Sequence, residues 1–358
     1  MAEGRNNFHQ NYCMKKLYYC TFAGILITGT IISFAGCVKT GSSSDNLVGN
    51  WKKTDDFEGL ARTEAVSFTI GRKAYVCSGY AGNGRQLQDL WEYDYDGKFW
   101  TQKKPLPGPA RNFATGFSIG DKGYVGTGTD GFSLFKDLWE YDPSADSWTP
   151  KADLPGNGRR EAVGFSVNGK GYIACGYDGN YLRDCWEYTP GATAADPGAW
   201  AHRASVGGAK RAQATAFVVN NTAYVMGGNN NEDIQQDLWA YNVADNAWVE
   251  KAKLYNFLPD SFDDQYQHIA RQNGVALVID SKVYIATGEN GSMNTTTWEY
   301  TPATDRWKQK TGFEAPARTG ACGISIANHG FILTGSSSTL VMDNVYEFQP
   351  EVTKISND

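Results

Sequence analysis

Short segments in which hydrophobic and polar residues alternate follow one another along most of the chain, with turn residues between them. An alternation with a period of two is typical of β-strands. In one example, the segment 114–119 is followed by a turn at Gly120 and by a second apolar run around Tyr124. Such regularly spaced short strands predict an all-β protein.

The aromatic residues recur with a period of about 50 residues. A Trp-x-Tyr step begins at Trp91, Trp139, Trp186, Trp239 and Trp298, and a degraded sixth copy begins at Tyr346. A second column consists of Trp51, Trp100, Trp148, Trp200, Trp248 and Trp307. All eleven tryptophans belong to these two columns, which predicts repeated packing positions.

Arginine and glycine form two further columns in the same register. Arginine recurs at Arg62, Arg111, Arg159, Arg211, Arg271 and Arg318. A glycine follows seventeen residues after each arginine, at Gly79, Gly128, Gly176, Gly228, Gly288 and Gly335. An aromatic residue lies between them, at Tyr75, Tyr124, Tyr172, Tyr224, Tyr284 and Phe331. Units of this length, each with four short strands, predict the blades of a β-propeller.

These columns resemble the Kelch repeat, in which an arginine precedes the first strand, a glycine pair ends the second, and a Tyr and a Trp follow. The resemblance implies an all-β, six-bladed propeller over residues 49–350 with four antiparallel strands in each blade. Only Gly227-Gly228 preserves the complete glycine pair. The first position of the pair is otherwise Ser78, Thr127, Cys175, Thr287 or Thr334.

The two ends of the repeat predict how the ring closes. The sixth unit stops at Phe348 without a fourth-strand tryptophan, whereas Trp51 precedes the first arginine. We expect a strand over residues 49–54 to complete the last blade, which leaves no blade edge unpaired. Residues 351–358 would then form a C-terminal tail.

The N-terminal region has the features of a secretory signal. A basic pair, Lys15-Lys16, precedes an apolar run that ends in small residues directly before Cys37. The segment 1–37 resembles a bacterial lipoprotein signal, which implies cleavage directly before Cys37, lipid on that cysteine, and a flexible tether over 38–48. We therefore expect an outer-membrane lipoprotein in the cell envelope of a Gram-negative bacterium, on either its periplasmic or its outer side. An uncleaved signal anchor is the alternative.

Four cysteines remain beyond the signal: Cys77, Cys175, Cys185 and Cys322. They lack the paired spacing of a zinc site, and we expect them to be small buried residues. A disulfide between Cys175 and Cys185, across one hairpin, stays open.

Length and charge narrow the classes of function. A chain of 358 residues ordinarily suggests two or three domains, but the repeat assigns nearly all of it to one ring. The net charge of −6 argues against a nucleic-acid partner, because such binding depends on a basic surface. We expect a monomer with no metal and no cofactor.

One face of the ring is predicted to carry the function. Since antiparallel strands alternate in direction, the loops before the first strand and after the second strand lie on the same face. The step from second-column tryptophan to arginine is 11 residues in five cases but 23 from Trp248 to Arg271. We interpret the extra residues, within 254–270, as a lid or ligand wall. A tolerated surface insertion is the alternative.

The candidate ligand-binding residues lie in these loops and in the insertion. They are Tyr80, Asp130, Tyr177, Asn229 and Glu289, with Phe262, Tyr266 and His268 from the insertion. Aromatic rings beside amide and carboxylate groups suit a glycan, and they suit a peptide equally well. The six arginines could attract an acidic ligand by bidentate pairing. We favour the alternative, in which each arginine ties its blade to the next through backbone carbonyls.

We therefore expect a lipid-anchored, non-catalytic binding module for glycan or protein ligands, and we assign no catalytic residue. The alternative is a sugar-acid mutarotase, because the chain resembles bacterial Kelch-type sialic-acid epimerases. An acid such as Asp263 or Glu289 would then act with Arg271. A copper-radical oxidase of the galactose-oxidase kind needs two histidines at one site, whereas only His268 lies on the binding face.

Overall fold

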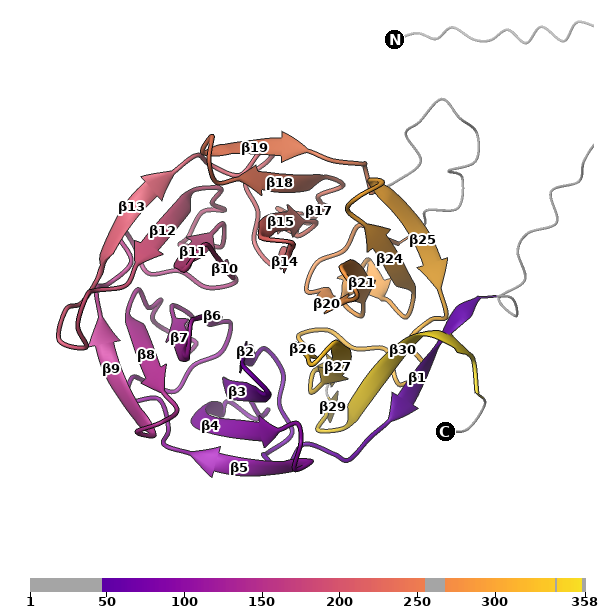
Figure 1. The fold of residues 1–358 in the computed structure, drawn as a ribbon, viewed down its shortest axis with the longest axis horizontal. Helices are drawn as coiled ribbons and strands as arrows, with labels where there is room; N and C mark the ends of the chain where they lie inside the picture. Colours follow the sequence, from indigo (N-terminus) through magenta and orange to yellow (C-terminus); the bar gives the residue numbers. More distant parts are fainter. Residues whose placement is uncertain (1–46, 255–267, 339, 356–358) are drawn as a thin grey trace, which may run out of the picture. The chain divides into compact units, whose positions relative to one another are not determined.

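The computed structural model describes residues 47–254, 268–338 and 340–355. These residues form six four-stranded antiparallel sheets that are arranged as the blades of a ring (Figure 1). The all-β, six-bladed prediction is therefore confirmed. Cys37, Phe262, Tyr266 and Asp263 lie outside the described residues. No helix in the described ranges is long and apolar enough to cross a membrane.

The first three blades follow one another along the chain. Blade 1 contains β2 (Val66–Ile70), β3 (Lys73–Tyr80), β4 (Gln86–Asp94) and β5 (Phe99–Lys103). Blade 2 contains β6 (Thr115–Ile119), β7 (Lys122–Gly126), β8 (Leu138–Asp142) and β9 (Ser147–Lys151). Blade 3 contains β10 (Val163–Val167), β11 (Lys170–Ala174), β12 (Cys185–Thr189) and β13 (Ala199–Arg203).

Blades 4 to 6 carry small additional hairpins. Blade 4 contains β14 (Thr215–Val219), β15 (Thr222–Met226), β18 (Leu238–Asn242) and β19 (Ala247–Glu250). Blade 5 contains β20 (Val275–Ile279), β21 (Lys282–Ala286), β24 (Thr297–Thr301) and β25 (Arg306–Lys310). Blade 6 contains β26 (Cys322–Ile326), β27 (His329–Leu333), β30 (Val345–Thr353) and β1 (Val48–Lys53).

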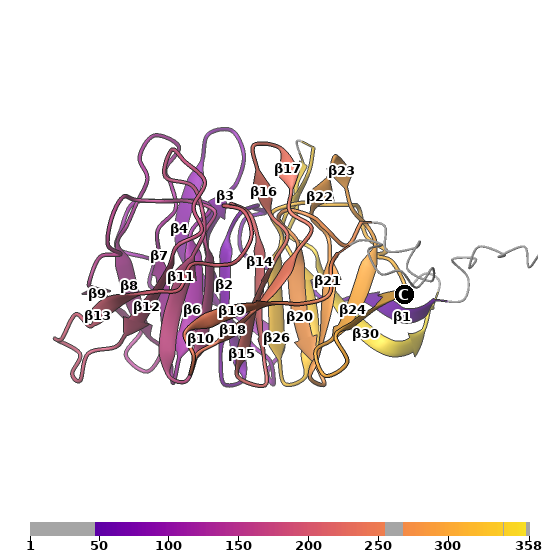
Figure 2. The same ribbon diagram turned by 90° about the horizontal axis from the view of Figure 1, so that it is seen from above.

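The additional hairpins follow the second strands of these blades. They are β16 (Asn229–Asn230) with β17 (Asp233–Ile234), β22 (Glu289–Asn290) with β23 (Ser292–Met293), and β28 (Ser336–Ser337) with β29 (Leu340–Val341). In the side view, the hairpins of blades 4 and 5 stand at the upper edge of the ring (Figure 2). This edge is the face that carries the arginines and glycines, and we call it the arginine face.

The ring closes by pairing the first strand with the last. β1 pairs antiparallel with β30, and Trp51 lies opposite Phe348. The predicted closure of the last blade is therefore confirmed. The pairing extends to Val48 and Thr353, so the propeller includes three residues that the sequence assigned to the C-terminal tail.

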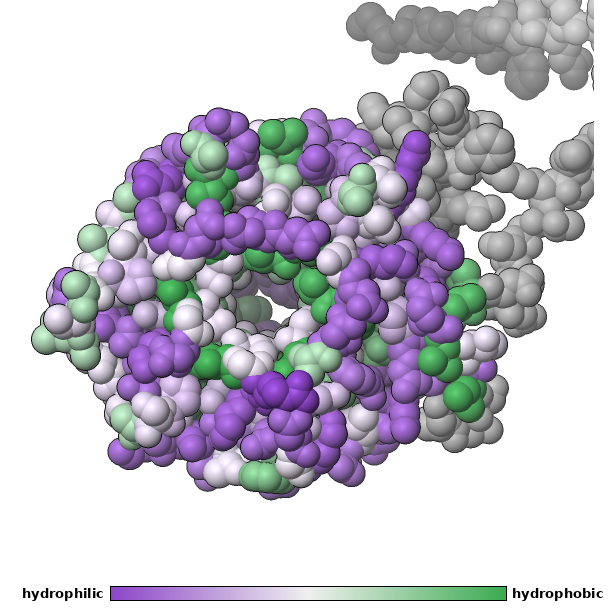
Figure 3. Space-filling view, in the orientation of Figure 1, coloured by the Kyte–Doolittle hydropathy of each residue, from purple (hydrophilic) through white to green (hydrophobic). Residues whose placement is uncertain are grey.

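Small residues on the inner strands allow neighbouring blades to pack closely. Phe68 of β2 stacks on Tyr75 of β3, with ring centroids 5.0 Å apart. Gly123 of the next blade lies against the same phenyl ring, and a Cβ atom at this position would approach a ring carbon to 2.1 Å. Space-filling representation shows the channel at the centre of the ring, bordered by hydrophobic residues (Figure 3).

The four cysteines beyond the signal are buried and free, which confirms their prediction as buried apolar residues. Cys175 and Cys185 therefore form no disulfide in this structure. Burial raises the pKa of the Cys77 and Cys175 thiols to about 12.

We expect Trp51→Ala to destabilise the whole ring, because Trp51 fixes β1 to blade 6. Its side chain is 1% exposed, packs against Phe313 and Phe348 at centroid distances of 4.8 and 4.5 Å, and donates from Nε1 to Thr297 Oγ1. The loss should be about 3–5 kcal/mol in the free energy of unfolding, measured by urea denaturation. Lys52→Ala, at an exposed neighbour on the same strand, is the control. Equal stability of the two variants would contradict this role of β1.

Candidate functional site

The six column arginines are buried beneath the arginine face. Their side chains are 0–3% exposed. In the first four blades each guanidinium forms a bidentate pair with an aspartate of its own blade: Arg62 with Asp89, Arg111 with Asp137, Arg159 with Asp184, and Arg211 with Asp237. The N–O distances are 2.5–2.9 Å. Because both terminal nitrogens already bind an aspartate, these four guanidinium groups cannot form a bidentate pair with an acidic ligand.

The aspartate partners were missed by the sequence reasoning, although they leave a signal. Each lies two residues before the first-column tryptophan, and that indole also donates to it, as Trp91 Nε1 does to Asp89 Oδ2 at 2.8 Å. Burial alone would raise the pKa of Asp89, but the hydrogen bonds and charge of Arg62 outweigh it and lower the pKa. The same balance lowers the pKa of Asp184 and Asp237.

Blades 5 and 6 lack the aspartate. The Arg271 guanidinium instead contacts Thr296 Oγ1 and backbone carbonyls, including that of His268, and Arg318 contacts Asn344 Oδ1 at 2.7 Å. Burial without a carboxylate lowers the pKa of Arg271 to about 9 and that of Arg318 to about 10. Nη2 of Arg318 is buried without a hydrogen-bond partner.

The link between blades runs through the arginine backbone, which corrects our expectation for the side chain. The guanidinium groups bond within their own blade, as Arg62 Nη1 does to the Ser78 carbonyl at 2.9 Å. Each column glycine instead donates its N–H to the carbonyl of the arginine in the following blade, at 2.7–2.9 Å. At Gly228 the chain has a φ of 82°, and a Cβ atom would approach the Ala212 carbonyl oxygen to 2.6 Å. This close approach explains the glycine column.

A second set of backbone hydrogen bonds joins six residues that form a ring around the channel mouth. The residues two positions after the arginines are Glu64, Phe113, Glu161, Gln213, Asn273 and Gly320, all with positive φ. The N–H of Glu64 donates to the Gly320 carbonyl, and that of Phe113 donates to the Glu64 carbonyl. Three further bonds continue through Glu161, Gln213 and Asn273. These residues line a cavity of about 150 Å³ at the axis.

Two carboxyl groups of this ring have raised pKa values. Desolvation by burial raises the pKa of Glu64 to about 7, and the negative charge of Glu161 adds to this effect, although a hydrogen bond from Asn112 opposes it. Burial also raises the pKa of Glu161. Asn112 Nδ2 lies 2.6 Å from a Glu64 oxygen, while Asn112 Oδ1 is buried without a partner. Glu64 is therefore a group that exchanges a proton near neutral pH.

Polar side chains continue from the mouth across blades 4 to 6. Gln272 Nε2 donates to Glu289 Oε1 at 2.8 Å, and Asn229 Nδ2 donates to Gln213 Oε1 at 2.8 Å and also contacts Gln272. Thr319 reaches Glu289 at 3.5 Å. The predicted site residues Asn229 and Glu289 thus share one network.

The remaining predicted site residues lie in separate loops of the arginine face. Tyr80 Oη accepts the Gly84 N–H at 2.9 Å. Asp130 caps its own loop by accepting the N–H groups of Phe132 and Ser133, and these bonds lower its pKa. His268 is exposed, and its carbonyl accepts a bond from Arg271.

Tyr177 lies in a polar cavity of about 420 Å³ between the loops of blades 3 and 4. Its ring meets that of Tyr181 edge to face at 5.2 Å, and the Arg160 guanidinium lies 5.4 Å from the Tyr177 centroid. The wall also includes Lys210, Glu161 and three asparagines: Asn180, Asn230 and Asn231. Since Glu161 also belongs to the ring at the axis, this cavity adjoins the channel mouth. Among the residues described, no three His, Cys, Asp or Glu side chains form a group that could hold a metal ion.

The comparisons with known proteins agree with this architecture. A family model described as "Kelch motif" matches residues 210–254, which include blade 4. The solved structure titled "Structure of YjhT" superimposes with a TM-score of 0.66 at 16% identity, covering 80% of this chain and 95% of that one. No curated protein matches the chain. The protein is thus similar in fold to a known propeller structure and carries a Kelch motif within a six-bladed ring.

We expect Asn344→Asp to stabilise the protein, because it gives Arg318 the carboxylate that four other arginines have. The new Oδ2 would accept from the unpartnered Nη2 and should add about 1–3 kcal/mol to the free energy of unfolding at pH 7. Since the pKa of such an aspartate is lowered in the folded state, the gain should be lost as the pH falls below about 4. Urea titrations at pH 7 and pH 3 measure both effects.

The matched variant Asp137→Asn should destabilise blade 2 by about 3–5 kcal/mol, because it removes the negative partner of a buried guanidinium. An Asn344→Asp chain that is no more stable than the wild type would contradict this account of the column.

Glu64→Gln should remove a pH dependence of stability. Because the folded-state pKa of Glu64 is raised, the folded protein holds this proton more tightly, and wild-type stability should fall as the pH rises from about 4.5 to about 7. The variant should therefore exceed the wild type by about 1–3 kcal/mol at pH 8 and match it near pH 5. Glu58→Gln, at an exposed site, is the control. A difference that is equal at both pH values would show that Glu64 is not the titrating group.

Proposed function

We propose that this protein is a binding module whose ligand is a glycan held on the arginine face, beside the channel mouth. A propeller with Kelch motifs is commonly a binding or scaffold module. The observation that carries the proposal is the cavity around Tyr177 and Tyr181. Aromatic rings there can stack on the apolar face of a sugar, and the asparagine amides can bind its hydroxyl groups.

The charges of this cavity favour a sugar that carries an acid. Lys210 is exposed at its rim, and Arg160 lies over the Tyr177 ring. Arg160 also forms a weak 3.6 Å pair with Glu161. These two cations, rather than the buried column arginines, are the groups that a ligand carboxylate would meet.

Tyr177→Ala should weaken glycan binding at least tenfold, because it removes one stacking surface, whereas Phe99→Ala should leave binding unchanged. Phe99 is a matched aromatic control, since it is 51% exposed at the start of β5 on another blade. A glycan array followed by calorimetry on the selected sugars measures the effect. Equal binding by both variants, or selection of a protein ligand that ignores Tyr177, would contradict the proposal.

A sugar-acid mutarotase is the second candidate, and Glu64 is the observation that favours it. A carboxyl group with a pKa of about 7 at the channel mouth can accept and return a proton at neutral pH. Arg271 does not suit the role we expected for it, because its guanidinium is buried and held by the chain itself. Exchange of sialic-acid anomers, followed by NMR, should be accelerated by the wild type and lost in Glu64→Gln if this candidate is correct.

We propose further that lipid on Cys37 anchors the propeller at the outer membrane of a Gram-negative bacterium. The support is the basic pair, apolar run and small residues before that cysteine. Mass spectrometry of the mature N-terminus tests this anchor, since a chain that retains residues 1–36 would contradict it.

A further inference from the structure

A repeated hydrogen-bond device closes the boundaries between blades on the outer side of the ring. The tyrosine of the Trp-x-Tyr step donates its hydroxyl to a side chain five residues later, as Tyr141 does to Asp146 at 2.8 Å. The same carboxylate accepts the Lys104 N–H of the preceding blade at 3.0 Å. The device recurs with Tyr241, Asn246 and Ala204, and with Tyr300, Asp305 and Ala252.

A second hydrogen bond strengthens two of these boundaries and also the boundary between blades 2 and 3. The fourth-strand indole donates to a carbonyl of the preceding blade at 2.8–2.9 Å. The pairs are Trp148 with Lys104, Trp200 with Ala152, and Trp248 with Ala204. At each of these boundaries, a side chain of one blade therefore forms a hydrogen bond with the backbone of the preceding blade.

The boundary between blades 6 and 1 lacks both of these hydrogen bonds. In the repeat, Lys98 occupies the position of Asp146, and Asp55 occupies that of Lys104. Within the described part of the chain, the hydroxyl of Tyr93, the indole N–H of Trp100 and the backbone N–H of Asp55 have no hydrogen-bond partner. Tyr93 is also only half-buried, whereas the other members of its column are buried.

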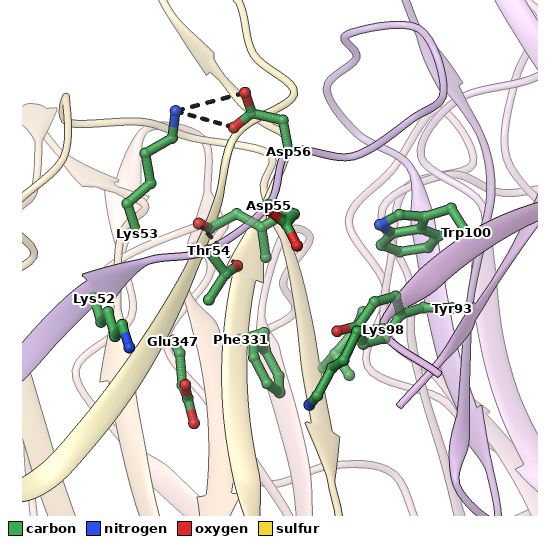
Figure 4. A pocket seen from close by; sticks show the side chains of 12 residues that line it. Lys52, Lys53, Thr54, Asp55, Asp56, Tyr93, Lys98, Trp100, Phe331 and Glu347 are labelled. Atoms are coloured by element: carbon green, nitrogen blue, oxygen red, sulfur yellow. Dashed lines mark hydrogen bonds and ion pairs between the residues drawn. The ribbon is translucent and has the colours of Figure 1, made fainter. Parts of the chain in front are cut away.

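A cavity of about 570 Å³ opens at this position (Figure 4). Tyr93 and Trp100 form one wall, and the Trp100 nitrogen faces Asp55. Phe331 lies on the opposite side, where the five other blades have a tyrosine. Trp100 is 8% exposed, and its indole N–H lies at the edge of the cavity.

The charged residues that line this cavity are three lysines and three acids. Lys53 pairs with Asp56 at 3.2 Å, and Glu347 contacts His329. Lys52, Lys98 and Asp55 remain, and no salt bridge within the described residues involves them. The Lys98 ammonium lies 3.6 Å from the centroid of the Tyr95 ring, next to the cavity wall.

We propose that this cavity, which we call the closure pocket, binds a small organic carboxylate. The ligand carboxylate would occupy the place that the side chains of Asp146, Asn246 and Asp305 fill at the other boundaries. It would accept hydrogen bonds from Tyr93 and from the backbone of Asp55, with Lys98 beside it. An apolar or aromatic body would pack against Phe331 and Trp100. This site is independent of the glycan site on the arginine face.

Lys98→Asp is the decisive variant, because it supplies the acceptor that the repeat has elsewhere. Lys98 has a φ of 58°, close to the 44°, 48° and 52° of Asp146, Asn246 and Asp305. An aspartate tolerates this left-handed conformation better than a lysine does, so we expect the variant to fold. It should raise the melting temperature by about 2–4 °C, since it fills the vacant acceptor position.

The binding test uses the purified full chain with benzoate as probe and benzyl alcohol as its uncharged counterpart. The wild type should bind benzoate saturably, with a Kd at or below about 1 mM, and bind benzyl alcohol at least tenfold more weakly. Lys98→Asp should lose benzoate binding at least tenfold, and Tyr93→Phe should weaken it about threefold to tenfold by removing one donor. Lys308→Asp, the same charge change at an exposed residue of β25 outside this pocket, should bind like the wild type.

Three outcomes would overturn the proposal. The first is no saturable binding of benzoate to the wild type, and the second is equal affinity for the wild type and Lys98→Asp. The third is an unchanged or lower melting temperature of Lys98→Asp. None of these outcomes bears on glycan binding by the arginine face, which is tested through Tyr177.

Discussion

The structure depends on burying one guanidinium group under each blade. A buried cation is costly unless its hydrogen-bonding capacity is met, and four blades meet it with an aspartate that binds both terminal nitrogens. Holding the side chain in this way also fixes the arginine backbone. Its carbonyl then accepts the glycine N–H of the preceding blade, which joins neighbouring blades. The charge pair inside a blade thus orients the contact between blades.

Burial of the six guanidinium groups restricts where an acidic ligand can bind. Six arginines around a channel suggest an anion site, but their guanidinium groups are already saturated or buried. The groups that remain accessible are those that vary between blades, such as Glu64 and Glu161 at the axis and Tyr177 in the adjoining loop. Residues that recur in the blades stabilise the propeller, whereas residues that differ between blades provide the groups that can contact a ligand.

The six-bladed fold could be predicted from the sequence alone, because the residues that pack the blades recur at the same positions of each repeat. The tryptophans, arginines and glycines each mark a contact that every blade must make, so six copies reinforce one another. The aspartates that pair with the arginines were also visible, two residues before four of the first-column tryptophans, but their partner could not be inferred without knowing that the guanidinium turns inward. The raised pKa of Glu64 and the vacancy beside Tyr93 could not be predicted, because both arise from the surroundings of a side chain and not from its identity.

The closure of blade 6 has a consequence for the folding of the chain. Asn50 and Gln349 are joined by a side-chain hydrogen bond across 299 positions of the sequence. The other five blades each form from one continuous segment, whereas the sixth needs both ends of the propeller to meet. Until they meet, β1 and β30 each have an unpaired edge. Such long-range pairing slows folding and leaves strand edges exposed to other chains, so we expect closure of blade 6 to be the step of folding that is most prone to aggregation.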